Sequence, residues 1–138
     1  MYFSGIESSI QIHANKEGIL GASDLQLRCD YSLGSEEEVI GSSIQAKINN
    51  VFQSIAYSFE KDSTGDDPKF STYGNYLSSR ANLSNPTPSL PNTVILTFNQ
   101  IECEDEREYR CTVTVKVNGK FNTSASDATS IVVKGKYT

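Results

Sequence analysis

Apolar and polar residues alternate along most of the chain, and this pattern constrains the fold more than any other feature. The stretches "SSIQIHA", "DLQLRCDYS", "SSIQAKI" and "YRCTVTVKV" all place an apolar residue at every second position. Because successive side chains of a β-strand point to opposite faces, each stretch predicts a strand with one buried face. "FQSIAYSFE", "TVILTF" and "ATSIVVK" add further strands, whereas "SEEEVIGS" is too short for a helix.

Turn-forming residues separate these stretches. "KDSTGDDP" and "SNPTPSLPN" hold Gly and Pro, and "VNGK" holds the pair Asn118 and Gly119 between two alternating segments. Asn-Gly in this setting predicts a hairpin with a type I′ turn. Many short strands with regular turns predict an all-β sandwich or barrel.

Length and charge exclude several classes of function. The 138 residues suit one domain, residues 1–138, with its core at about 9–134. The net charge of −5 argues against nucleic-acid binding and against docking on an anionic membrane. No apolar run approaches the roughly 20 residues of a membrane-spanning helix, and "MYFSGIESSI" shows no secretory leader. We expect no direct membrane insertion by this segment.

The stretch "ECEDEREYRC" is the densest cluster of chemically reactive side chains. Its five carboxylates could suggest a cation site, but a strand sends alternate side chains to opposite faces, so they do not converge. The spacing of Cys103 and Cys111 does not suit zinc, and His13 is the only histidine. His13 also has no nucleophile partner in any motif. We therefore expect no metal, no cofactor and no enzymatic activity.

Three cysteines allow at most one intrachain bridge and leave one thiol over. Cys29 and Cys111 both lie on the apolar faces of alternating segments. A bridge between them would stabilise the fold by about 4.5 kcal/mol in the chain-entropy treatment. Cys103 stays a candidate for an intermolecular bridge or a free thiol.

"DEREYRC" has the form D-x-x-x-Y-x-C, and here the chain resembles the variable-type set of the immunoglobulin superfamily over roughly residues 25–133. The resemblance implies a two-sheet, immunoglobulin-like V-type β-sandwich with Greek-key topology. It implies a Cys29–Cys111 bridge between the sheets and a Tyr109 hydroxyl bonded to backbone a few residues upstream. It also implies an ion pair between Asp105 and Arg80.

The chain departs from that family in three places. The family usually has a Trp on strand C that packs against the disulfide. This chain has no Trp, and Ile44 is the expected replacement. Arg107 occupies a position where the family usually has Gly or Ala, and the last strand lacks F-G-x-G. "IQAKINNVFQSIAYSFEKD" resembles the immunoglobulin domains of snail fibrinogen-related defence proteins, which also lack this Trp.

These features predict a non-catalytic, extracellular recognition or adhesion domain that binds a protein or glycan in cell–cell or innate-immune recognition. The expected contacts lie in the connection "LGSEEEVIGS", the segment at 62–68, the front strands and the last hairpin. The candidate binding residues are Asn118, Gly119, Lys120, Phe52 and Tyr57.

The alternative is a structural or oligomerisation module of a larger secreted lectin-like protein, in which Cys103 joins subunits. Two sequons, at Asn82 and Asn122, are candidate glycosylation sites and agree with secretion.

Overall fold

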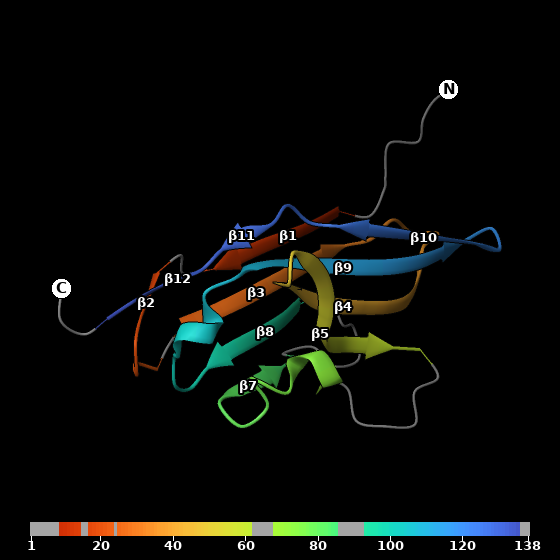
Figure 1. Ribbon diagram of the computed structural model, residues 1–138. Coiled ribbons are helices and arrows are strands. Elements are labelled where there is room, and N and C mark those ends of the chain that lie inside the picture. Colours follow the sequence, from red (N-terminus) through yellow and green to blue (C-terminus); the bar gives the residue numbers. More distant parts are fainter. Residues whose placement is uncertain (1–8, 15–16, 24, 62–67, 86–92, 136–138) are drawn as a thin grey trace.

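Two β-sheets pack face to face in the computed structural model, which describes residues 9–14, 17–23, 25–61, 68–85 and 93–135 (Figure 1). The back sheet runs in the order β1 (Ser9–Ala14), β3 (Leu25–Ser32), β8 (Thr93–Phe98), β7 (Ala81–Ser84). The front sheet runs in the order β10 (Lys120–Ala125), β9 (Glu108–Val117), β4 (Glu38–Ile48), β5 (Val51–Glu60), β6 (Lys69–Phe70), and β11 (Thr129–Ser130) also pairs with β9. A short parallel pair joins β2 (Glu17–Ile19) to β12 (Val132–Lys134), and the 3₁₀ turns are η1 (Thr72–Gly74) and η2 (Cys103–Asp105).

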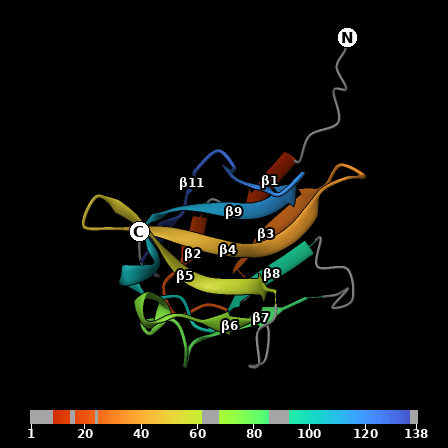
Figure 2. The same cartoon turned by 90° about the vertical axis from the view of Figure 1, so that its right-hand side faces the viewer.

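This strand order confirms the predicted V-type sandwich. The four back strands correspond to the A-B-E-D sheet of an immunoglobulin domain, and the front sheet adds two strands beyond G-F-C, as variable-type domains do. Figure 2 shows β9, β4 and β5 side by side in one layer, with β3 and β8 in the other.

The core lies between the sheets and consists mainly of inward-facing strand residues, with Leu77, Ile101 and Ile131 added from the connections. Leu27, Leu96 and Phe98 of the back sheet are fully buried. The Cys29–Cys111 disulfide crosses from β3 to β9, with the two Cα atoms 6.1 Å apart. Ile44 on β4 lies opposite Cys111 in the strand register and is fully buried, so it occupies the place beside the bridge.

Two hairpins of the front sheet close through positive-φ turns. Asn118 and Gly119 have φ of 53° and 77°, as a type I′ turn requires, and they join β9 to β10. Asn49 and Asn50, with φ of 53° and 67°, join β4 to β5 in the same way. Asn tolerates the left-handed region because its side chain can bond locally. The second turn was not predicted from the sequence, although "NN" between two strands is the pattern that forms it.

The connection from β3 to β4 is shorter than expected. The sequence suggested a loop over residues 33–42, but β4 begins at Glu38, so only residues 33–37 connect the strands. A register shift between Val39 and Gly41 lets the strand continue through a stretch that does not alternate cleanly. Of the expected contact segment at 62–68, residues 62–67 lie outside the described residues.

Candidate functional site

The cluster of carboxylates in "ECEDEREYRC" is built around one buried ion pair. Asp105 is fully buried, and its two carboxylate oxygens accept hydrogen bonds from Nη1 and Nη2 of Arg80, both at 2.8 Å. The backbone N–H of Glu102 donates a third hydrogen bond to Asp105 Oδ2, also at 2.8 Å. Together these bonds fix η2 against the residue that precedes β7. The hydrogen bond and charge of Asp105 raise the pKa of Arg80, which therefore stays protonated.

Tyr109, at the start of β9, also bonds to this turn, and we call η2, Arg80 and Tyr109 together the corner. The Tyr109 hydroxyl donates to the backbone carbonyl of Asp105 at 2.8 Å and lies 3.2 Å from the Tyr76 hydroxyl. Burial raises the pKa of both phenols, that of Tyr76 to about 12. Arg107 stacks its guanidinium over the Tyr76 ring, 4.8 Å from the ring centre, and donates a hydrogen bond to the Lys47 carbonyl. The arginine that departs from the family pattern therefore packs against the outside of the corner.

The remaining carboxylates of this stretch are also engaged. Glu104 accepts a hydrogen bond from Arg80 at 3.2 Å, and Glu106 accepts one from the backbone N–H of Val133 at 2.9 Å. Glu108 pairs with Lys47 at 3.3 Å. The pair of Asp105 with Arg80 was expected from the sequence, but none of these three contacts was. Within the described ranges, no three His, Cys, Asp or Glu side chains are arranged to hold a metal ion.

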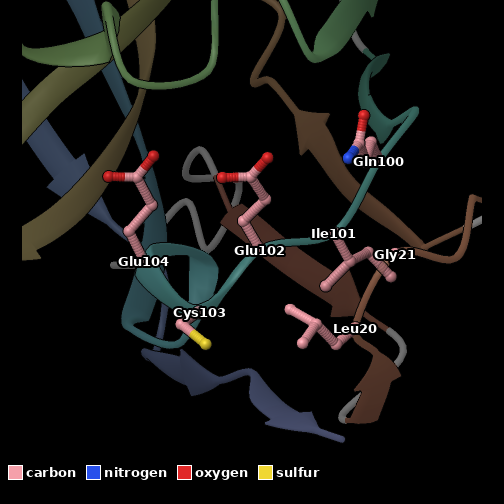
Figure 3. Close-up of a pocket in the computed structure, with 7 residues that line it drawn as sticks. All are labelled: Leu20, Gly21, Gln100, Ile101, Glu102, Cys103 and Glu104. Carbon is pink, nitrogen blue, oxygen red and sulfur yellow. The ribbon is translucent and has the colours of Figure 1, made fainter. Parts of the chain in front are cut away.

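Cys103 is an exposed free thiol on η2. It borders a shallow hollow of about 480 Å³ that Leu20 and Ile101 also line. Figure 3 shows the sulfur pointing away from the carboxylates of Glu102 and Glu104, toward Leu20. The thiol is thus accessible, but it is not part of the ion-pair network.

A second hollow, of about 610 Å³, lies on the outward face of the front sheet. Hydroxyl groups dominate its floor and are linked to one another across strands. Ser43 Oγ lies 2.6 Å from Thr112 Oγ1, and Ser54 Oγ donates to Ser43 Oγ at 3.3 Å. Thr114 Oγ1 lies 2.8 Å from Thr123 Oγ1 on the edge strand. These groups also retain lone pairs, so the floor can accept hydrogen bonds from a ligand.

Arg110 provides the cation of this hollow. Its Nε donates to Gln45 Oε1 at 2.7 Å, and its guanidinium lies 4.1 Å from the centre of the Phe52 ring. Lys47 approaches the same ring at 5.5 Å. Stacking and the Gln45 bond hold the guanidinium in one orientation, which prepares it to meet an acceptor without a large entropy cost.

The structure separates the binding residues that the sequence suggested. Tyr57 lines the outward hollow together with Phe59. Phe52 lies beneath Arg110 and supports that side chain. Asn118, Gly119 and Lys120 form the exposed tip of the β9–β10 hairpin and are not among the residues that line the hollow.

Sequence reasoning missed the hydroxyl floor. The polar positions of "YRCTVTVKV" include Thr112 and Thr114, and the same alternation that predicted the buried valines places these threonines on the outward face. Ser43 lies opposite Thr112 only because β4 pairs with β9 in the observed register. The threonines could therefore have been placed on a face from the sequence, but their partners could not.

Comparison with known proteins agrees with the topology. No protein-family profile matches the sequence, and no curated protein matches it. Among solved structures, the chain is similar to murine CRIg, with a TM-score of 0.63 and 15% sequence identity over 91% of this chain and 98% of that chain. This similarity establishes the immunoglobulin-like fold.

No helix in the described part of the chain is both long and apolar enough to cross a bilayer.

Proposed function

We propose that this chain is a non-catalytic, extracellular recognition domain that binds a protein or glycan ligand through the outward face of its front sheet. The observation that carries the proposal is the hollow of about 610 Å³, in which hydroxyls, an oriented guanidinium and two aromatic rings converge. Concave sites with a few fixed polar groups and aromatic walls are the usual form of binding sites. The intrachain disulfide supports an oxidising, extracellular environment.

The composition of the hollow favours a hydrogen-bonding ligand over a purely apolar one. Ser43, Thr112 and Thr114 offer hydroxyls, and Arg110 offers N–H donors. Tyr57 adds apolar area with a polar tip, a combination enriched at interfaces.

The test is a binding screen with the tetramerised domain against purified ectodomains and an array of glycans. For any ligand found, Arg110→Ala and Tyr57→Ala should each weaken binding by about tenfold or more, the scale of an interface hot spot. Arg28→Ala is the matched control, because Arg28 is a 55% exposed arginine on β3 of the back sheet. Equal loss of affinity in Arg28→Ala and Arg110→Ala would place the contact elsewhere.

A second function, assembly of a larger secreted protein, is favoured by one observation. Cys103 is exposed, and apolar side chains flank it at the hollow of about 480 Å³. If Cys103 joins subunits, the wild-type protein should run as a dimer on a non-reducing gel, and Cys103→Ser should run as a monomer. A monomer in both cases would contradict the assembly role and leave recognition untouched.

The resemblance of residues 44–62 to the snail defence proteins remains a proposal about origin. It fits the absence of Trp and the presence of Ile44 beside the disulfide. Binding of the domain to microbial surface glycans in the same array would support an innate-immune role.

A further inference from the structure

Both sequons of the chain lie on strands at the edges of the two sheets. Asn82, in Asn82-Leu83-Ser84, is on β7, which ends the back sheet. Asn122, in Asn122-Thr123-Ser124, is on β10, which ends the front sheet at the opposite flank. An edge strand offers backbone groups that a second chain could pair with, so natural proteins commonly cover or charge such edges.

The Asn82 side chain lies on the outer side of the back sheet. Its neighbour Ala81 is 5% exposed and faces the core opposite Phe98, and alternation places Asn82 on the other side of β7. Asn82 is exposed there, opposite Thr97. A group attached to Asn82 therefore projects away from the front sheet.

The Asn122 side chain also avoids the outward face of the front sheet. In an antiparallel pair, directly opposed residues share a face. Asn122 is opposite Val115, which is 1% exposed and faces the core, whereas Thr123 is opposite Thr114 on the outward face. Asn122 is nevertheless exposed, because β10 is the last strand of its sheet. A group on Asn122 projects from the flank between the sheets, on the side of β1, which approaches β10 (Figure 1).

We infer that Asn82 and Asn122 both carry N-linked glycans, which cover the β7 and β10 edges and leave the outward face of the front sheet bare. The inference rests on the extracellular location in the proposed function, because the modification occurs in the secretory pathway. The two glycans leave the hollow that Tyr57 and Arg110 line open to a ligand. The recognition surface is then the one sheet face that neither glycan shields.

The modification is a group transfer from a lipid-linked oligosaccharide diphosphate. The amide nitrogen of Asn forms a bond to the anomeric carbon of the first sugar. The bond between that carbon and the diphosphate oxygen breaks, so the lipid diphosphate leaves with the electron pair. The amide nitrogen loses one proton to a base, and no oxidant or reductant is needed.

The first experiment measures occupancy. The full chain is secreted from a eukaryotic cell line behind an added cleavable signal, and peptide-N-glycosidase then converts each glycosylated Asn to Asp before peptide mapping. Both Asn82 and Asn122 should convert. Ser84→Ala should abolish conversion at Asn82 only, and Ser124→Ala at Asn122 only, while Ser84→Thr and Ser124→Thr should retain it. Secreted protein with either asparagine unconverted would overturn the inference for that site.

The second experiment tests the geometry by chemical labelling of Tyr57, which lines the hollow. Enzymatic removal of both glycans should leave the labelling rate of Tyr57 unchanged. The triple variant Thr123→Asn, Ser124→Ala, Ala125→Ser moves the sequon by one residue and hence to the other face of β10. Its glycan should slow Tyr57 labelling severalfold. Faster labelling of the wild type after glycan removal would overturn the inference that this face is bare.

These outcomes are separable from the failure of the proposed function. If front-sheet substitutions leave ligand binding unchanged, the recognition proposal fails, while the inferred positions of the two glycans are unaffected. If Asn122 is unoccupied or its glycan shields Tyr57, the glycan inference fails while binding through Arg110 can still be measured.

Discussion

Replacing Asp105 with Asn tests whether the corner is held by its charge and its three hydrogen bonds. The two side chains have almost the same shape, but the amide offers one acceptor oxygen where the carboxylate offers two. In the observed geometry, one oxygen can still receive Arg80 Nη1 and the Glu102 N–H, while the new NH₂ group faces Nη2 donor to donor. One hydrogen bond between charged groups is lost, worth about 1.5–3 kcal/mol, and the two that remain lose their charge assistance.

The expected cost is therefore about 3 kcal/mol of unfolding free energy, since Asp105 is fully buried and the Arg80 side chain is only 11% exposed. Urea unfolding measures this value directly, and the melting temperature should fall by roughly 10 °C. In a double-mutant cycle with Arg80→Gln, the coupling free energy should be about 1–3 kcal/mol.

Asp30→Asn is the matched control. Asp30 also pairs with an arginine, Arg28, at 3.0 Å, but both side chains are accessible, with exposed fractions of 28% and 55%. An exposed pair of this kind contributes less than about 1 kcal/mol. A loss below about 1 kcal/mol for Asp105→Asn, or one no larger than that of Asp30→Asn, would refute the reasoning.

Four further predictions concern stability. Replacing Cys29 and Cys111 together with Ala should cost about 4.5 kcal/mol by urea unfolding, because the bridge closes a loop with a sequence separation of 82; a cost near zero would contradict this. Ile44→Ala should cost about 2–5 kcal/mol, because it leaves a cavity beside the bridge, and a cost below 1 kcal/mol would indicate that the core there is loose. Gly119→Ala should cost about 1 kcal/mol through its φ of +77° alone, since a Cβ there meets no atom within 4 Å. Burial raises the pKa of the Tyr76 phenol from 10.0 to about 12, so the unfolded chain releases this proton at lower pH than the folded one. The free energy of unfolding should therefore be unaffected by this group below pH 10 and should fall as pH rises through about 12. Tyr76→Phe should reduce that loss of stability at alkaline pH.

The fold was largely predictable because local rules specify it. Alternation assigns each strand a buried face, and the residues of "DLQLRCDYS" and "YRCTVTVKV" that it placed inside are buried, except Val117 at the end of β9, which is partly buried. Asn118 and Gly119 were identified as a turn because few residue pairs tolerate two positive φ values. The end of the β3–β4 connection was misplaced because "EVIGSS" does not alternate, and only pairing with β9 extends β4 back to Glu38.

The candidate site was less predictable, because its parts come from strands far apart in the sequence. Tyr57 was identified as a candidate, but Arg110 was not. The orientation of the Arg110 guanidinium depends on Phe52 and Gln45, which lie 58 and 65 positions away in the sequence and become its neighbours through strand pairing. No local sequence pattern indicates that the hydroxyls of Ser43 and Thr112 lie opposite each other.

The sequence by itself determined which residues face the core, where the Asn118–Gly119 turn falls and which asparagines can carry glycans. These properties depend on a residue and its immediate neighbours. Only the tertiary structure decided that Glu104, Glu106 and Glu108 bond to Arg80, to the Val133 backbone and to Lys47, and that the hydroxyls of β4, β5 and β9 form one floor. It also decided that Asn82 and Asn122 avoid that floor. Those relations depend on sheet order and register, which are set by packing two apolar faces together rather than by any local pattern.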